Sequence, residues 1–289
     1  MYSLFYATNR AHRLPTVCYL SYRSGCRFIF YHVYGMTHQQ LVIAQLNRIP
    51  STLELALQIR LKLPLLPISE IEEKAVNFYL RFDEYGLGLQ STTKKAPGSL
   101  YVDFKRLTKR VGDSVLQQNL FKAIGARKGK RPGIVDATAG LGTDSFLFAA
   151  IGCHVLAIER NPIVFALLED GSNRFLRLGA LEAEIIERIE LCQANFLEAA
   201  ETLESTQVVY LDPMFPTKNK IAKAKKGMYY LQELIGSSSN DKELLEAAYT
   251  VATERIVVKR AKNSPFISVK EPSISFRGSS SRYDVYLLN

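Results

Sequence analysis

Short apolar runs recur through the second half of the chain, and stretches with helical spacing separate most of them. The runs that predict strands span residues 133–136, 154–159, 188–193, 207–211 and 255–259, and then 272–276 and 283–288. Strands that alternate with helices predict a mainly parallel sheet with helices on both faces. No clear helix separates the last two runs, which permits an antiparallel end to the sheet. We therefore expect an α/β fold built on a doubly wound, mainly parallel sheet of seven strands.

The part of the chain before this sheet has a different pattern, which predicts a small N-terminal α+β subdomain over residues 36–91. Residues 52–66 have an alternating or helical apolar pattern, and residues 71–89 contain strand-like stretches. Residues 100–104 predict one further short strand. The main domain is expected over residues 92–289.

Composition excludes several classes of protein. The chain has 289 residues, of which 47% are hydrophobic, so it can bury a full α/β core and a smaller appendage. No apolar run reaches the roughly 18 residues needed to span a bilayer, and the N-terminus lacks a signal-peptide pattern. The cysteines show no paired-ligand spacing and stand at Cys18, Cys26, Cys153 and Cys192. We expect reduced thiols, no metal and a cytoplasmic protein.

The first candidate site is a glycine turn between a predicted strand and a predicted helix. Asp136 ends the strand, and Gly140 and Gly142 follow it. Glycines let backbone amides approach a ligand closely, and the turn delivers that ligand to a helix N-terminus. The next strand ends at Glu159, where a carboxylate can accept both hydroxyls of a ribose. The pattern predicts a nucleotide-like ligand, although an ordinary βα turn and a helix-capping acid remain open alternatives.

The acids around the turn decide between two classes of ligand. A nicotinamide dinucleotide would need a third glycine, which falls at Ser145, and Asp136 and Asp144 would repel its pyrophosphate. S-adenosylmethionine (SAM) carries no phosphate, and either acid can hold the ammonium group of its amino-acid end. The sequence therefore favours SAM as the cofactor.

The candidate acceptor site is the segment Asp212–Pro216, directly after the apolar run Val208–Leu211. The Asp212 carboxylate and the Pro213 carbonyl can accept both hydrogens of an exocyclic amine, and Phe215 offers a face for stacking on a flat base. Alone, the segment is more often the start of a turn after a strand. Beside a methyl-donor site it predicts methyl transfer to a base amine, in which these residues orient the amine and stabilise its developing charge.

A family resemblance rests on four segments, which are Asp136–Asp144, Glu159–Pro162, Val208–Pro216 and Val257–Arg260. Together they resemble the ribosomal RNA small subunit methyltransferase J family, and the resemblance covers roughly residues 52–289. It implies a Rossmann-like methyltransferase fold. It also implies methyl transfer from SAM to the exocyclic N2 amine of one guanine near the 3′ end of bacterial 16S ribosomal RNA. The implied partner is this RNA or the small ribosomal subunit, with no membrane and no obligate protein partner.

The resemblance further implies donor contacts at the ends of four strands. These are Thr143 and Asp144 in the turn, Glu159 and Arg160 after the second strand, Asn195 and Phe196 after the third, and Asp212 after the fourth. Asn195 can hydrogen-bond the adenine amine, and Phe196 can pack on the adenine ring. Phe196 is equally typical of a core aromatic, and Arg160 of an exposed charge.

Positive charge is concentrated in two segments of this chain, whose net charge is +9. Residues 94–131 hold eleven Lys or Arg against two Asp. The acceptor segment is followed by five lysines that are predicted to contact RNA phosphates, namely Lys218, Lys220, Lys223, Lys225 and Lys226. We expect both segments to flank the acceptor site, although each alone is typical of a solvated surface.

Two other functions stay open. One is a SAM-dependent methyltransferase that acts on an adenine or cytosine amine in DNA or another RNA, and the other is a non-catalytic RNA-binding module. The status of residues 1–35, which carry four arginines and no acid, is also open. Either translation begins at Met36, or these residues form a basic arm for RNA. The polar residues 37–40 predict a helix through Leu41 and Leu46.

Overall fold

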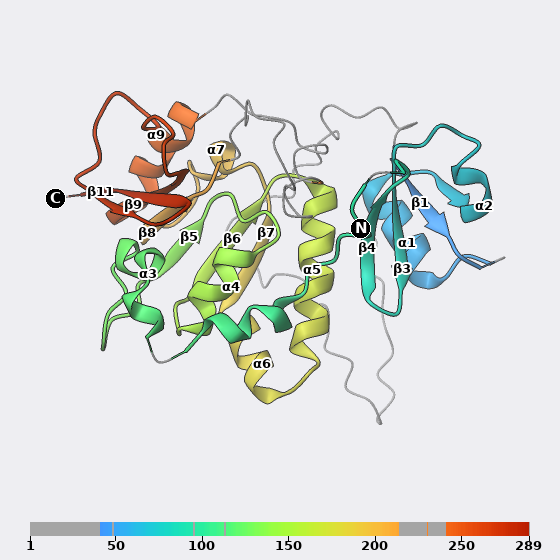
Figure 1. The fold of residues 1–289 in the computed structure, drawn as a ribbon, viewed down its shortest axis with the longest axis horizontal. Coiled ribbons are helices and arrows are strands. Elements are labelled where there is room, and N and C mark those ends of the chain that lie inside the picture. The colour runs from blue at the N-terminus through green and yellow to red at the C-terminus, as the bar shows by residue number, and fades with distance from the viewer. Residues whose placement is uncertain are drawn as a thin grey trace.

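The computed structural model describes residues 41–47, 49–94, 96–112, 114–213, 230 and 241–288. These residues form two sheets, with helix α5 (Pro162–Leu176) between them (Figure 1). The predicted N-terminal extension, the predicted stacking residue Phe215 and the five predicted RNA-binding lysines lie outside the described residues.

The smaller sheet has four strands in the order β2-β1-β3-β4. Its elements in chain order are β1 (Leu41–Gln45), α1 (Thr52–Leu61), β2 (Leu65–Pro67), α2 (Ile68–Ile71), β3 (Phe78–Asp83) and β4 (Gly86–Ser91). Helix α1 begins at a capping box, in which Ser51 and Glu54 satisfy each other's backbone amides. A small N-terminal α+β unit is thus present, while the domain boundary at residue 91 stays a prediction.

Two local predictions are wrong. The segment predicted as a helix through Leu41 and Leu46 contains strand β1 instead. This strand lies between two others and its first four residues are buried, so the alternation that marks a strand is hidden. Residues 100–104 form no strand, because Leu100 makes only an isolated bridge to Leu89 and the chain then turns into the 3-10 helix η1 (Phe104–Arg106).

The larger sheet has seven strands in the order β10-β11-β9-β8-β5-β6-β7. The elements that follow η1 are η2 (Thr108–Arg110), η3 (Val115–Gln117), α3 (Asn119–Ala123), β5 (Ile134–Asp136), α4 (Thr143–Ala150), β6 (Val155–Glu159), α5, α6 (Ala180–Ile186), β7 (Ile189–Gln193), α7 (Phe196–Ala199), β8 (Thr206–Leu211), α9 (Asp241–Val251), β9 (Ala252–Ala261), β10 (Ile274–Arg277) and β11 (Ser281–Leu287). All seven predicted strands are present, and the antiparallel end is confirmed because β11 runs against β9 and β10.

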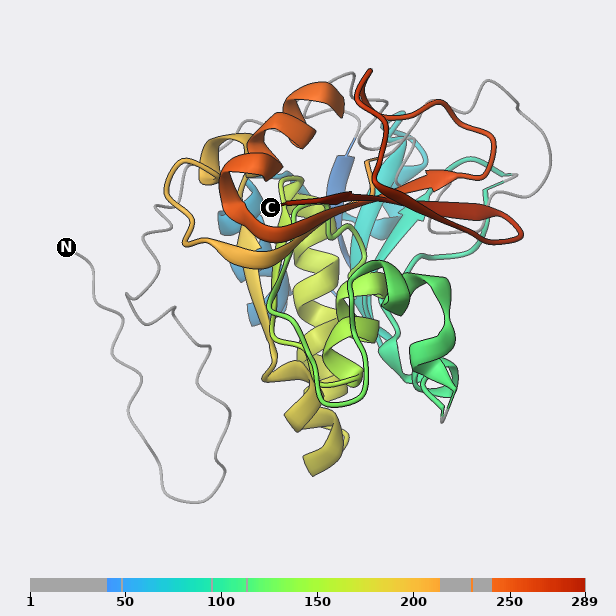
Figure 2. The same cartoon turned by 90° about the vertical axis from the view of Figure 1, so that its left-hand side faces the viewer.

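Helices cover both faces of this sheet, as a doubly wound fold requires. Figure 2 shows α9 on one side of the strands near the C-terminus and the α3 region on the other. Alternate residues of β9 follow this division: Val257 packs into the core that contains Phe121 of α3, whereas Ile256 and Val258 pack into the core that contains Leu244 of α9. Within the described part of the chain, no helix is long and apolar enough to cross a membrane.

The strand order reverses between β5 and β8, which are hydrogen-bonded neighbours although four helices and two strands separate them in sequence. Ligands of open α/β sheets bind at the carboxyl ends of the strands at such a switch point. Asp136 ends β5 and Asp212 directly follows β8, so both acids lie at this position.

Candidate active site

The glycine turn after β5 contains two left-handed glycines with different surroundings. Gly140 has φ +56, and among the described residues a Cβ there would meet only the Thr138 carbonyl oxygen, at 3.9 Å. Gly142 has φ +72, and a Cβ there would come within 2.4 Å of Leu168 Cδ1 in α5. Gly140 therefore leaves open space for a ligand. Gly142 is explained by close packing between the turn and α5, rather than by the predicted approach of a ligand.

Helix α4 starts directly after this turn, and its first turn contains Thr143 and Asp144. No side chain caps the helix, because its N-cap residue is Gly142. The first amides of an α-helix have no partner within the helix, and they favour a carboxylate or another anion. The N-terminus of α4 is therefore suited to the carboxylate of an amino-acid ligand.

Asp136 is buried beneath the turn, with 2% of its surface exposed. It accepts a hydrogen bond from Ser145 Oγ at 2.5 Å and one from the Thr138 amide at 3.3 Å. Burial, together with the nearby carboxylates Asp144 and Asp212, raises the pKa of Asp136 to about 7 in spite of these bonds. The geometry makes Asp136 a support for the turn, and Asp144 is the more exposed candidate for the ligand's ammonium group.

Glu159 ties the end of β6 to the same turn. Its Oε2 accepts from the Gly140 amide at 2.9 Å, and its Oε1 accepts from the Asn161 amide at 2.7 Å. Burial raises its pKa, although the two amide bonds and Arg160 oppose this shift. The Arg160 amide is a third backbone donor, so of the four lone pairs on the two carboxylate oxygens one remains for a ribose hydroxyl.

Lys259 of β9 joins the donor turn to the acceptor segment. Its ammonium group lies 2.7 Å from Asp144 Oδ2 and 2.8 Å from Asp212 Oδ2. Two more contacts fix these acids: the Tyr210 hydroxyl donates to Asp144 Oδ2 at 2.7 Å, and the Asp212 amide donates to Thr138 Oγ1 at 2.6 Å. The carboxylates predicted for donor and acceptor thus share one cation.

The charges in this cluster shift one another's pKa values. Burial acts to lower the pKa of Lys259, but Asp212 and Asp144 raise it above its ordinary value, so the lysine stays charged. Desolvation raises the pKa of Asp212, and Lys259 opposes that rise. Burial, together with the charge of Asp144, holds the pKa of Tyr210 well above its usual range, so this residue remains a hydrogen-bond donor.

Lys259, Tyr210 and Thr138 are not among the site residues predicted from the sequence. Lys259 belongs to the segment Val257–Arg260, and the signal that could have identified it is a charge inside an otherwise apolar strand. Tyr210 gives a similar signal, because it places a hydroxyl in the fully buried part of β8. A buried polar group needs a partner, so both point to a nearby polar site.

The remaining predicted residues do not all face this cluster. The Asn195 side chain caps α7 through the Leu197 amide and donates to Glu198, which leaves it at the site's edge. The Phe196 ring is 2% exposed and belongs to the core, so it does not offer the predicted face to adenine. Arg160 is exposed, and Pro213 is buried directly after the acceptor acid. Among the described residues, no group of three or more His, Cys, Asp or Glu is placed to hold a metal ion.

The basic segment over residues 94–131 does not flank Asp212 along its whole length, contrary to expectation. Lys130 contacts Glu254 at the start of β9, and Gly125 of the same segment lies against Arg255. Asp212 lies at the opposite end of the neighbouring parallel strand β8. The later part of this segment therefore lies at the end of the parallel strands opposite to the candidate active site.

Comparison with known proteins identifies the family. A family model described as "Putative SAM-dependent methyltransferase" matches residues 64–288. The ribosomal RNA small subunit methyltransferase J of Pseudomonas savastanoi pv. phaseolicola is 41% identical over 226 residues, which are 76% of this chain and 82% of that protein. This chain belongs to the ribosomal RNA small subunit methyltransferase J family.

Other relatives agree with this methyltransferase J membership. The methyltransferase J of Thioalkalivibrio sulfidiphilus is 39% identical over 240 residues, covering 80% of this chain and 91% of that protein. The crystal structure of a SAM-dependent methyltransferase from Neisseria gonorrhoeae has a TM-score of 0.64 at 29% identity, over 86% of this chain and 96% of that one. The predicted fold class, the family and SAM as methyl donor are confirmed.

Proposed function

We propose that this chain transfers the methyl group of SAM to the exocyclic N2 amine of a guanine near the 3′ end of 16S ribosomal RNA. Membership of the methyltransferase J family supports ribosomal RNA as the substrate. The observation that carries the chemistry is the position of Asp212, which Lys259 holds at the switch point beside the glycine turn. Donor and acceptor residues meet there across two neighbouring strands.

The residues present fit SAM at the donor site. Glu159 would accept a ribose hydroxyl, the N-terminus of α4 would take the carboxylate, and Asp144 would take the ammonium. Asn195 lies at the end of β7, where its amide oxygen retains a lone pair for the adenine amine. SAM supplies a methyl group activated by a positively charged sulfur. No metal is needed for this transfer.

Acceptor chemistry would depend on Asp212 and the carbonyl of Pro213. The guanine amine is a weak nucleophile, because its lone pair is delocalised into the ring. Two acceptors aimed at its hydrogens would orient that lone pair toward the methyl group and stabilise the positive charge that develops on nitrogen, which is worth about 2 to 4 kcal/mol. Asp212 Oδ2 binds Lys259, and among the described residues no donor bonds Oδ1, which leaves this oxygen for the amine.

The substrate would be 16S ribosomal RNA, either free or within the small ribosomal subunit, and the reaction would therefore take place in the cytoplasm. We propose Phe215 as the residue that stacks on the guanine. The lysines that follow it, from Lys218 to Lys226, are proposed to contact phosphates near the target base.

This function is tested with purified protein, tritiated SAM, and both 16S RNA and small subunits from cells that lack the gene. The wild type should release N2-methylguanosine on nuclease digestion, whereas Asp212→Ala should lose most of the transfer at saturating SAM. Glu184→Gln removes an exposed acid on α6 and serves as the control. Methyl groups found on adenine or cytosine would support the alternative acceptor. The absence of methyl transfer to both RNA substrates would contradict the proposal.

A further inference from the structure

A cavity lies at the end of the seven-stranded sheet opposite to Asp212. Its volume is about 360 Å³, and its lining includes Lys122, Arg127, Lys130, Arg255 and Phe276. Arg255 is near the start of β9, and Lys130 precedes β5. Arg255 pairs with Val208 in the sheet, and the path from Val208 to Asp212 along β8 measures roughly 13 Å at ~3.3 Å per residue, so this basal pocket is separate from the methyl-transfer site.

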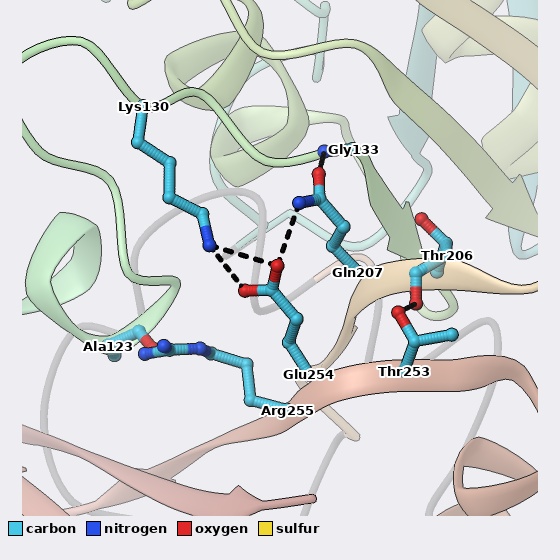
Figure 3. Close-up of polar contacts among 8 residues, drawn as sticks. All are labelled: Ala123, Lys130, Gly133, Thr206, Gln207, Thr253, Glu254 and Arg255. Carbon is cyan, nitrogen blue, oxygen red and sulfur yellow. Dashed lines mark hydrogen bonds and ion pairs between the residues drawn. The ribbon is translucent and has the colours of Figure 1, made fainter.

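One acid beside the basal pocket is already paired. Lys130 Nζ lies 2.9 Å and 2.6 Å from the two carboxylate oxygens of Glu254, and Gln207 Nε2 donates to the same carboxylate at 2.8 Å (Figure 3). Gln207 Oε1 in turn accepts from the Gly133 amide at 2.9 Å, which fixes the group to the start of β5. Glu254 therefore holds Lys130 in place and balances one of the four positive charges.

Arg255 is held in a fixed orientation by its neighbours. Its Nη1 donates to the Ala123 carbonyl oxygen at 3.3 Å (Figure 3). The guanidinium lies against Gly125, where a Cβ would come within 2.7 Å of Arg255 Cζ. Its Nε is buried and has no hydrogen-bond partner among the described residues. The surface of this Nε is covered by protein, so an anion in the pocket would be attracted by the charge of the guanidinium rather than bound by Nε.

Lys122 and Arg127 complete the positive surface, and both are exposed. Neither forms an ion pair with any other residue in the described part of the chain. Glu254 lies close to both Lys130 and Arg255, so four cations and one acid leave a net of three positive charges around a cavity that also has an aromatic wall, Phe276. Cations beside an aromatic face are the combination that proteins use to hold a phosphate and its nucleotide.

We propose that the basal pocket binds a phosphate of the RNA backbone and anchors the substrate roughly 13 Å along the sheet from the methyl-transfer site. The inference rests on the proposed function, because it takes RNA as the substrate. A volume of about 360 Å³ is at the lower end of the range for small-ligand sites, so the pocket holds one nucleotide of the polymer. Arg255 is the fixed contact, and Lys122 and Arg127 close on the phosphate from the solvent side.

The test is the affinity of the protein for a fluorescent transcript of the 3′ region of 16S RNA, measured over a series of KCl concentrations. The variant Lys122→Gln/Arg127→Gln removes two exposed charges. We expect its affinity to fall roughly threefold to tenfold per charge, and its log–log salt slope to fall by about 0.7 to 0.9 per lost phosphate contact. The control Lys128→Gln/Lys242→Gln removes two exposed charges outside the pocket and should behave like the wild type.

Binding of SAM, measured by calorimetry on each variant, shows whether the fold is intact. If the wild type transfers methyl groups to RNA but the pocket variant binds RNA with unchanged affinity and slope, the pocket proposal is overturned and the proposed function stands. If the wild type binds RNA through the pocket without methylating it, the proposed function fails and the pocket proposal stands. Guanosine monophosphate that binds the pocket more tightly than the transcript would also overturn the assignment to RNA.

Discussion

Replacement of Lys259 by Met is the sharpest perturbation of the candidate active site. Methionine keeps most of the apolar stem but removes the cation that lies 2.7 Å from Asp144 and 2.8 Å from Asp212. Two carboxylates would then face each other without a shared partner. We expect the variant to fold with lower stability and to lose most of its methyl transfer at neutral pH.

The expected loss of stability follows from how deeply the cluster is buried. The side chains of Lys259, Asp144 and Asp212 are 25%, 11% and 39% exposed. Removing one partner of a fully buried pair costs about 3 to 5 kcal/mol, and of an exposed pair about 0 to 1 kcal/mol. The cluster lies between these limits, so we expect a loss of about 1 to 3 kcal/mol.

Activity should also change its dependence on pH. Lys259 opposes the desolvation that raises the pKa of Asp212, so the pKa of Asp212 rises further without it. Transfer that needs the Asp212 carboxylate is lost as the pH falls through this pKa. The acidic limb of the pH–rate profile should therefore move to higher pH in Lys259→Met, and Lys259→Arg should restore part of it.

Urea unfolding and single-turnover transfer at saturating SAM, each measured from pH 6 to 9, test these expectations. Lys242→Met is the matched control, because Lys242 on α9 is 77% exposed and its pair with Glu246 spans 3.6 Å. It should change stability by less than about 0.5 kcal/mol. Lys259→Met with wild-type rates and an unshifted profile would refute the role assigned to the shared cation.

Three further predictions concern the donor turn. Asp136→Asn should flatten the pH dependence of stability. The raised pKa of Asp136, about 7, stabilises the fold at low pH, and about 2 kcal/mol of this stabilisation is lost between pH 5 and 7. If the free energy of unfolding changes with pH in the variant as it does in the wild type, the burial of Asp136 as an acid is contradicted. Glu159→Gln should weaken SAM binding about tenfold or more in calorimetry, because a neutral amide is a poorer acceptor for a ribose hydroxyl, and equal affinity would remove that contact. Gly142→Ala should destabilise the protein by about 2 to 4 kcal/mol and Gly140→Ala by only about 1 to 2 kcal/mol, since only Gly142 adds a clash to the left-handed strain; equal melting temperatures would contradict this difference.

The strands and the positions of their terminal acids are predictable from the sequence for a simple reason. The runs that form β5, β6 and β8 end in an acid or are directly followed by one, and parallel strands bring their carboxyl ends to one edge of the sheet. Asp136, Glu159 and Asp212 were therefore expected to lie close together. Strand β1 was not predictable, because a short, fully buried run such as Leu41–Ala44 lacks the alternation that distinguishes a strand from a helix.

Side-chain partners were less predictable than strand ends. The bridge from Lys259 to two acids depends on β9 lying next to β8, an order that the local pattern does not specify. Asn195 and Phe196 follow a strand as predicted, yet one caps α7 and the other fills the core. The same residue types serve capping, packing and ligand contact, and only the surrounding structure separates these roles.

The most direct test of the proposed function is mass mapping of modified nucleosides in 16S ribosomal RNA from three strains: cells lacking the gene, cells complemented with the wild type, and cells complemented with Asp212→Ala. N2-methylguanosine at one position near the 3′ end should be absent without the gene, return with the wild type and stay absent with the variant. An unchanged modification pattern in cells lacking the gene, or full restoration by Asp212→Ala, would contradict the assignment of guanine N2 methylation to this site.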